Sequence, residues 1–189
     1  MAGKTFSNLI AFDDAPFDPD HRGDVPVVGA VYAGLRLDGF LTGKVRRDGA
    51  NSTRNLIALV EESKYREHLQ LLLLQGIALA GFNVVDVHTL SRRLGLPVLV
   101  VARRQPNLAS IREALLGHVP GGARKWALIQ RLEPMEACGP VFVQRVGLDR
   151  ESARQVVGRF AIHGHIPEPL RICHLMAGAM VLGESRGRA

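Results

Sequence analysis

The sequence has little cysteine and no long apolar run. Its 189 residues include only two cysteines, Cys138 and Cys173, and their wide separation fits neither a disulfide framework nor a zinc-ligand spacing. Reduced thiols in a cytoplasmic protein are therefore expected. No apolar run reaches the roughly 18 residues that span a bilayer, and the first residues lack the apolar segment of a signal peptide. We therefore expect no membrane partner.

Aromatic residues are also scarce, at 5% of the chain, which disfavours a base-stacking platform of the single-strand-binding type. The net charge of +6 and the pI near 10.0 are compatible with a polyanionic partner such as nucleic acid. The positive residues form short groups near the ends of expected strands and helices. They are Lys44, Arg46 and Arg47; Arg92 and Arg93; Arg103 and Arg104; and Arg124 and Lys125. A solvated rim and a nucleic-acid contact surface both explain this pattern.

The first half of the chain predicts three strands and a helix. Residues 7–12 are mostly apolar and lead into an acidic loop, and the segments 25–32 and 35–45 flank Ala33-Gly34, which is typical of an antiparallel hairpin. Asn51, Ser52 and Thr53 offer helix N-cap chemistry, and a helical pattern continues towards His68.

The second half alternates strands with helices. Residues 69–74 lack polar alternation, which indicates a strand covered on both faces. A helix is expected from about 81 to 94, ended by Gly95, followed by a strand at 96–101. Further helices are expected at about 108–117, 121–132, 149–162 and 168–182, with a last edge strand at 139–146. No repeat or linker interrupts residues 1–189, so we expect one domain.

This order predicts an α/β protein with a ribonuclease H-like mixed sheet. Its first three strands are antiparallel, parallel strands follow, and helices cover both faces. The catalytic site of a ribonuclease H-like fold uses carboxylates from the first strand, the first helix and the tip of the fourth strand, because Mg²⁺ requires hard anionic oxygen ligands. Asp13 ends the first strand, although Asp13-Asp14-Ala15-Pro16 is equally compatible with a simple turn. The tip of the fourth strand carries Gln75, a neutral amide.

Several segments, taken in order over nearly the whole chain, resemble an uncharacterised family of endonuclease V-like proteins. They are residues 11–17, 75–87, 96–104, 166–171 and 183–185. A more distant similarity to endonuclease V itself lies in Asp13, the strand tip at 75–76, and the segments 148–153 and 166–171. The resemblance implies a ribonuclease H-like fold and descent from a Mg²⁺-dependent phosphodiesterase that acts on deaminated nucleic acid.

The resemblance also assigns positions to the catalytic residues. Asp13 takes the place of the first-strand aspartate, and His174 stands where the nuclease carries a histidine or an acid. Asn51 falls at the position of the helix glutamate, and Gln75 at that of the strand-tip aspartate. The nuclease's proline-tyrosine wedge has no counterpart between Lys44 and Asn51.

Two of three anionic ligands are thus replaced by amides, which contribute no charge to a cation site. The leading hypothesis is a nucleic-acid-associated protein with a degenerate metal site, at which Mg²⁺ or Mn²⁺ binding is weak or absent. The alternative is an active divalent-metal-dependent endonuclease in which Asp13, Asp14 and His174 hold one ion. A non-catalytic interaction domain is the third hypothesis.

The nucleic-acid contacts expected at the mouth of the site come from Lys44, Arg46, Arg47, Arg103 and Arg104. Two interpretations stay open for Asn83, a phosphate contact and a cap of its own turn. Asp86 is expected about one and a half turns into its helix with a structural role, and Glu168 is expected to favour the start of the last helix through the helix dipole. His163-Gly164-His165 lacks a third ligand and is read as an exposed turn, and Cys173 as a core residue.

Overall fold

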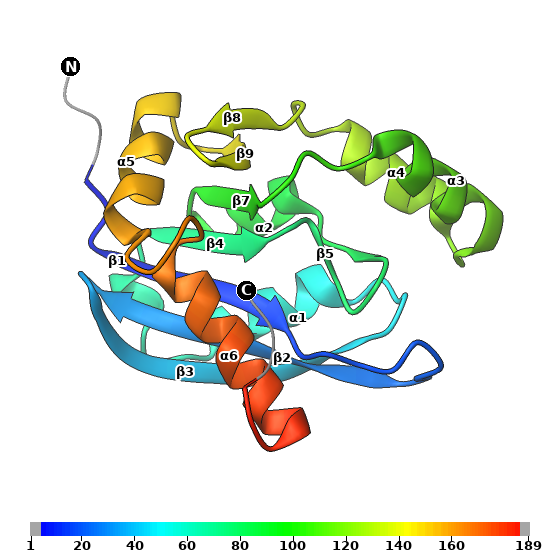
Figure 1. The fold of residues 1–189 in the computed structure, drawn as a ribbon, viewed down its shortest axis with the longest axis horizontal. Helices are drawn as coiled ribbons and strands as arrows, with labels where there is room; N and C mark the ends of the chain where they lie inside the picture. Colours follow the sequence, from blue (N-terminus) through cyan, green and yellow to red (C-terminus); the bar gives the residue numbers. More distant parts are fainter. Residues whose placement is uncertain (1–4, 186–189) are drawn as a thin grey trace.

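The computed structural model describes residues 5–185, in which a seven-stranded sheet has the order β3-β2-β1-β4-β7-β9-β8 (Figure 1). A separate two-stranded ribbon consists of β5 and β6. The strands are β1 (Asn8–Asp14), β2 (Asp24–Ala33), β3 (Arg36–Arg46), β4 (Leu71–Gln75), β5 (Ala78–Leu79), β6 (Asn83–Val84), β7 (Val98–Ala102), β8 (Glu136–Cys138) and β9 (Val141–Val146). The helices are α1 (Ser52–Glu61), the 3₁₀ turn η1 (Arg66–His68), α2 (Val87–Leu94), α3 (Leu108–His118), α4 (Gly122–Gln130), α5 (Arg150–Phe160) and α6 (Glu168–Leu182).

The strand directions confirm the expected mixed sheet. β1, β2 and β3 pair in an antiparallel manner, and β4 and β7 then run parallel to β1. As a result, β3, β1, β4 and β7 point the same way, and their carboxyl ends meet at one side of the sheet. We call this side the strand-end edge, meaning residues 44–48, 13–15, 75–77 and 102–104. Open α/β sheets present their ligand sites at such an edge.

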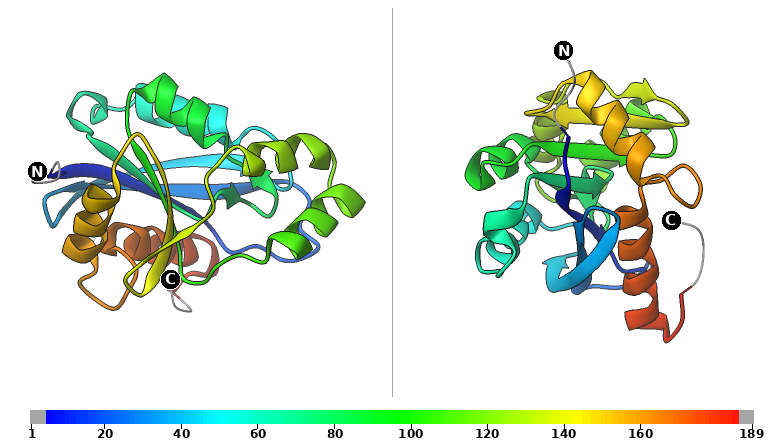
Figure 2. Two further views of the ribbon diagram at one scale, coloured as in Figure 1. Left: turned by 90° about the horizontal axis from the view of Figure 1, so that it is seen from above. Right: turned by 90° about the vertical axis from the view of Figure 1, so that its left-hand side faces the viewer.

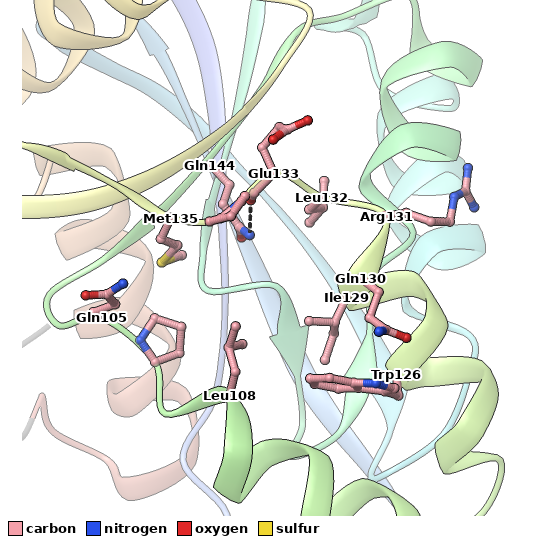
Figure 3. A pocket seen from close by; sticks show the side chains of 12 residues that line it. Gln105, Leu108, Trp126, Ile129, Gln130, Arg131, Leu132, Glu133, Met135 and Gln144 are labelled. Carbon is pink, nitrogen blue, oxygen red and sulfur yellow. Dashed lines mark hydrogen bonds between the residues drawn. The ribbon is translucent and has the colours of Figure 1, made fainter.

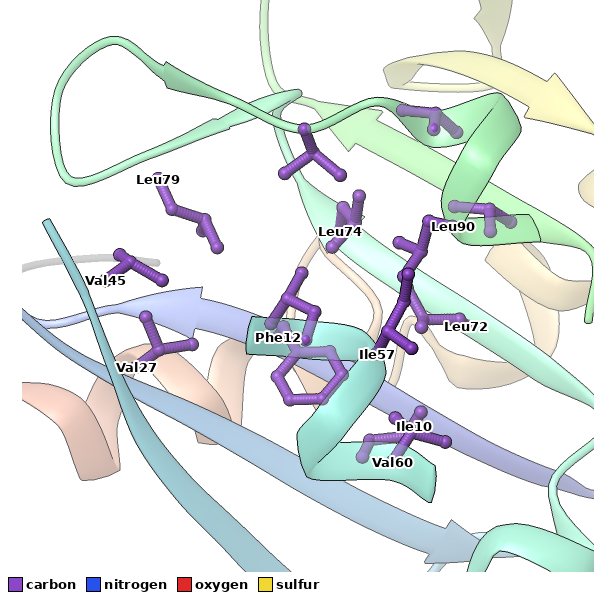
Figure 4. Close-up of a cluster of buried hydrophobic side chains, with 14 of the residues drawn as sticks. Ile10, Phe12, Val27, Val45, Ile57, Val60, Leu72, Leu74, Leu79 and Leu90 are labelled. Atoms are coloured by element: carbon purple, nitrogen blue, oxygen red, sulfur yellow. The ribbon is translucent and has the colours of Figure 1, made fainter. Parts of the chain in front are cut away.

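Helices cover both faces of the sheet, as expected. In the left view of Figure 2, α1 and α2 lie on one side, and α5 and α6 lie on the other. The α1–α2 face buries a cluster that includes Phe12, Leu56 and Leu74 (Figure 4), and the α5–α6 face buries Leu73 and Phe160. The side chains of successive strand residues point to opposite faces of the sheet. A polar residue at a strand end therefore lies on the same face as the apolar residue two positions before it.

A close contact at the centre of the sheet requires glycine. A Cβ atom built on Gly29 in β2 would lie 2.5 Å from the Cε1 atom of Phe12, which is fully buried in β1. Any larger side chain at position 29 would therefore displace the strand that carries Asp13.

Two expectations about secondary structure were wrong. The helix expected from residue 81 begins only at Val87, because residues 78–84 form the β5–β6 hairpin, which turns through Ala80 and Gly81 at positive φ. The strand expected at the sheet edge, β9, has a further strand, β8, paired outside it. Both cysteines are buried and free, and no helix within residues 5–185 is long and apolar enough to cross a membrane.

Candidate functional site

An aspartate and a histidine meet at the strand-end edge on the α5–α6 face. Asp13 is 5% exposed at the end of β1, and His174 of α6 donates from Nδ1 to its Oδ2 atom over 3.2 Å. This hydrogen bond raises the pKa of His174, against the opposing effects of burial and of Arg103. The imidazole is therefore biased towards its protonated form, and the pair has the character of an ion pair.

Gln75 lies beside this pair. Phe12 of β1 is in register with Leu74 of β4, so Asp13 and Gln75 follow as neighbours on adjacent parallel strands. Leu73 belongs to the α5–α6 cluster, which places the Gln75 side chain on the same face as Asp13. The Oε1 atom of Gln75 is buried and has no hydrogen-bond partner. A buried unpaired acceptor destabilises the fold by about 1–3 kcal/mol, and such an atom is available to a ligand.

Asp14 points the other way. Its Oδ2 atom accepts a hydrogen bond of 2.8 Å from the backbone N–H of Ala80, in the β5–β6 hairpin. Burial, followed by the nearby charge of Asp13, raises the pKa of Asp14 to about 6. The side chains of Asp13 and Asp14 thus leave β1 on opposite faces, an arrangement that does not favour their joint role as metal ligands.

Asn83 and Asn51 form a closed hydrogen-bond network behind the edge. The fully buried Asn83 donates from Nδ2 to the carbonyl of Arg46 (2.8 Å) and to Asn51 Oδ1 (2.7 Å), and it accepts from the N–H of Ser52 (3.0 Å). Asn51 Oδ1 also accepts from the N–H of Arg46. The side chain of Asn83 is therefore used inside the fold, a position that does not favour the phosphate contact considered for it. Asn51 joins the loop before α1 to β6.

Asp48 and Lys125 form hydrogen bonds beside the Asn83–Asn51 network. Asp48 accepts the N–H of Phe82 over 2.8 Å, and its carbonyl accepts the ammonium of Lys125, which is 4% exposed. Burial lowers the pKa of Lys125 in spite of the attraction of Asp48. These contacts tie α4 and the β5–β6 hairpin to the loop after β3.

The five basic residues expected at the mouth of the site all lie at the strand-end edge, but they differ in how they are held. The guanidinium of Arg47 contacts the carbonyls of Pro19 and His21 and pairs with Asp48 at 3.3 Å. Arg46 is 3.9 Å from Asp24, and the Lys44 side chain is exposed. Arg103 and Arg104 are exposed and make no ion pair within residues 5–185. With Lys44, for which no ion pair is found in the described chain either, they are the basic side chains of this group that are most available to an anionic partner.

The geometry does not fit a preassembled two-ion centre. No group of three or more histidine, cysteine, aspartate or glutamate side chains within residues 5–185 could hold a metal ion. Asp13 supplies one carboxylate, Gln75 supplies a neutral oxygen, and the Nδ1 atom of His174 is engaged by Asp13. Two Mg²⁺ ions need more anionic oxygen than this.

A second site feature, which the sequence reasoning missed, is a cavity lined by Gln144. One apolar cavity of about 240 Å³ lies between the β5–β6 hairpin, α3 and β9, and includes Gly76 and Ala102 of the strand-end edge. It adjoins another of about 440 Å³, which Trp126 borders (Figure 3). The two share lining residues, namely Pro106, Leu108, Ile129, Met135 and Gln144.

Gln144 holds an unpaired oxygen at this cavity. Its Nε2 atom donates to the carbonyl of Glu133 over 2.8 Å, which fixes the amide, and its buried Oε1 atom has no partner. Within residues 5–185, Gln75 and Gln144 carry the two buried side-chain oxygens without a hydrogen bond. No sequence signal marks Gln144, because its surroundings come from α3, α4 and the β5–β6 hairpin.

The remaining residues considered from sequence have structural surroundings. Asp86 caps the N-terminus of α2 through the N–H of Thr89, and does not lie within the helix as expected. Glu168 begins α6 and forms a bidentate pair with Arg171 at 2.6 and 2.7 Å. The Cys173 thiol donates to the carbonyl of Ala11.

Comparison with known proteins identifies the family. Residues 6–181 match the family model described as endonuclease dU. The chain belongs to the endonuclease dU family. A UPF0215 protein from Deinococcus radiodurans is 56% identical over 182 residues, which cover 96% of this chain and 93% of that protein. A UPF0215 protein from Methanothermobacter thermautotrophicus is 38% identical over 190 residues, which cover 98% of this chain and 93% of that protein.

Solved structures confirm the fold and the resemblance to endonuclease V-like proteins. A protein of unknown function from Archaeoglobus fulgidus has a TM-score of 0.85 at 33% identity, covering 92% of this chain and 98% of that one. Endonuclease V from Ciona intestinalis, in complex with DNA containing an inosine, has a TM-score of 0.57 at 14% identity, with coverages of 89% and 83%. The endonuclease dU family member described here therefore has a ribonuclease H-like fold, as the order of its strands and helices predicted.

Proposed function

We propose that this protein binds nucleic acid at the strand-end edge and recognises a deaminated base, uracil foremost, in the cavity at Gln144. The family model is described as endonuclease dU, and the Ciona endonuclease V was solved with inosine-containing DNA. Arg103 lies just after Ala102, which lines the cavity. Successive residues point to opposite faces, so a strand whose phosphate is held by Arg103 would cross the strand-end edge to place a base in the cavity.

The unpaired Oε1 atom of Gln144 carries this proposal. Deamination replaces a ring nitrogen acceptor with an N–H donor, since cytosine lacks a hydrogen at N3 and uracil has one. The change from adenine to hypoxanthine at N1 is the same. A buried acceptor aligned with this ring nitrogen, and not with the exocyclic amine of the parent base, pairs with the deaminated base and is left unpaired by the parent base, at a cost of about 1–3 kcal/mol. The orientation that Glu133 imposes on the amide directs this selectivity.

The test measures binding to oligonucleotides that differ at one base, deoxyuridine or deoxycytidine, with EDTA present. We expect at least about tenfold tighter binding of the deoxyuridine strand. Gln144→Leu should abolish the preference, whereas Gln130→Leu, at an exposed position on the rim of the larger cavity, should keep it. Equal affinity for the two strands, or a preference that persists in Gln144→Leu, contradicts the proposal.

A second candidate function is phosphodiester cleavage supported by one divalent ion. The observation that favours it is the unpaired Gln75 Oε1 beside the Asp13 carboxylate. Asp13 and Gln75 would hold Mg²⁺ or Mn²⁺, which would polarise a phosphate oxygen and acidify a bound water. Denaturing electrophoresis of the deoxyuridine strand with each cation tests it: cation-dependent cleavage that Asp13→Asn abolishes supports it, and an intact strand refutes it.

A further inference from the structure

A basic pocket adjoins the strand-end edge on the side of α6. It has a volume of about 520 Å³, within the range of small-ligand sites, and lies between the end of β7, the β8–β9 turn, the α5–α6 loop and α6. Its basic lining residues are Arg103, Arg104, His163, His165 and Arg171. Pro140, Val141 and Ile166 contribute apolar surface.

The pocket has an excess of positive charge that the described chain does not neutralise. Its acidic neighbour is Glu168, which is 7% exposed and is already bound by the Nε and Nη2 atoms of Arg171 and by His163 at 3.3 Å. Arg103 and Arg104 make no ion pair within residues 5–185. The carboxylate of Glu168 thus orients Arg171 and leaves two arginines for a ligand.

The pocket lies beside the Asp13–His174 pair. Arg103 lines it and is close enough to His174 to lower its pKa. Leu175, which follows His174 on α6, also lines it. An extended nucleic-acid strand that passes over Asp13 and His174 therefore meets this pocket beside Arg103.

We infer that this pocket binds a second phosphate group of the nucleic-acid strand, an inference that rests on the proposed function for the strand. Guanidinium groups suit this ligand because their planar donors match phosphate oxygens. Arg104 is the principal contact, and Arg171 is held in place by Glu168. The phosphate is either an internal diester or a terminal monoester.

The decisive experiment is the salt dependence of oligonucleotide binding for the wild type and for Arg104→Gln. Loss of one phosphate contact should reduce the slope of log affinity against log salt by about 0.7 for a single strand. The affinity at low salt should fall about tenfold. Arg154→Gln removes the same charge from the exposed surface of α5 and should leave both quantities unchanged. An Arg104→Gln variant that matches the Arg154→Gln control overturns the inference.

Strands with a 5′-hydroxyl, a 5′-phosphate or a 3′-phosphate separate the two sources. An Arg104→Gln effect that is equal for all three identifies an internal diester, and an effect confined to one phosphorylated strand identifies a terminal monoester. If Arg104→Gln changes the affinity for none of the three strands, the inference is overturned.

Titration with pyrophosphate separates failure of the pocket from failure of the proposed function. The ring resonances of His163 and His165 should shift in the wild type, and the shifts should weaken in Arg104→Gln. Shifts in a protein that binds no oligonucleotide would leave the phosphate pocket standing and refute the proposed function. Unshifted resonances overturn the pocket.

Discussion

The two faces of the strand-end edge contain similar polar residues and use them differently. On the α1–α2 face, Asn83, Asn51 and Asp48 bind backbone groups of neighbouring segments and close a network around the β5–β6 hairpin. On the α5–α6 face, Gln75 keeps a buried unpaired oxygen beside the Asp13–His174 pair. Amides that form hydrogen bonds with each other and with the backbone stabilise the fold, and an amide oxygen without a hydrogen-bond partner is available to a ligand.

The largest effect expected from this comparison is the loss of stability in Asn83→Ala. The change removes three hydrogen bonds and leaves the Ser52 N–H without its side-chain acceptor, while the Arg46 carbonyl keeps only the N–H of Gly49. We expect the free energy of unfolding to fall by about 4 kcal/mol, and the melting temperature by roughly 10 °C for a domain of this size. Thermal unfolding followed by circular dichroism measures it.

Asn55→Ala is the matched control, since Asn55 makes two exposed hydrogen bonds: it donates to the carbonyl of Lys44 and accepts from Nε of Arg54. Its cost should stay below about 1 kcal/mol. If Asn83→Ala were no more destabilised than this control, the network would not hold the fold.

Asp14→Asn should stabilise the protein in a pH-dependent manner. Its pKa is raised from 3.8 to about 6, chiefly by burial, so the folded state disfavours the ionised carboxylate relative to the unfolded chain. Stability from this group is retained below about pH 4, is lost as the pH rises to about 6, and stays lower above it. Asp14→Asn should therefore gain about 2 kcal/mol at pH 8 and almost nothing at pH 4.

Urea unfolding at the two pH values measures this gain, with the exposed Asp20→Asn as the control. An equal gain at pH 4 and pH 8 would show that ionisation of Asp14 is not its cause.

Much of the fold was predictable because its signals are local. The apolar run before Gln75 and the stop at Gly95 mark a buried strand and a helix end through nearest neighbours alone. The start of α2 was misplaced because positive φ at Ala80 and Gly81 allows a hairpin where apolar spacing favours a helix. The roles of Asn83 and Gln144 depend on which distant segments pack beside them, and that information is not local.

Gln75→Asp should turn the open face of the edge into a cation site. A second carboxylate beside Asp13 repels it, so the variant should lose about 1.5 kcal/mol of stability in EDTA. Mn²⁺ should restore this stability by mass action on the folded state, as measured by the melting temperature. Gln75→Asn, which leaves the side chain a neutral amide, should show no response to the cation. A wild type that Mn²⁺ already stabilises strongly would indicate that the present ligands form a working metal site.

The smallest effect concerns His174→Asn. The Asp13 hydrogen bond raises the pKa of His174 in the folded state, so its stabilisation is present below about pH 6.5 and is lost as the pH rises through the raised value. The variant should be less stable than the wild type by less than about 1 kcal/mol at pH 5.5, and equal to it at pH 9. Exposed His68→Asn provides the comparison, and a deficit at pH 9 as large as that at pH 5.5 would argue against the ion pair.

Hydrogen–deuterium exchange with a deoxyuridine-containing strand tests most directly whether the open part of the edge binds nucleic acid. We expect protection in peptides covering 75–77, 102–106, 141–146 and 163–175, with no change in the closed network at 51–55. Protection confined to the α1–α2 face, or absent from the strand-end edge at a saturating concentration of the strand, would contradict it.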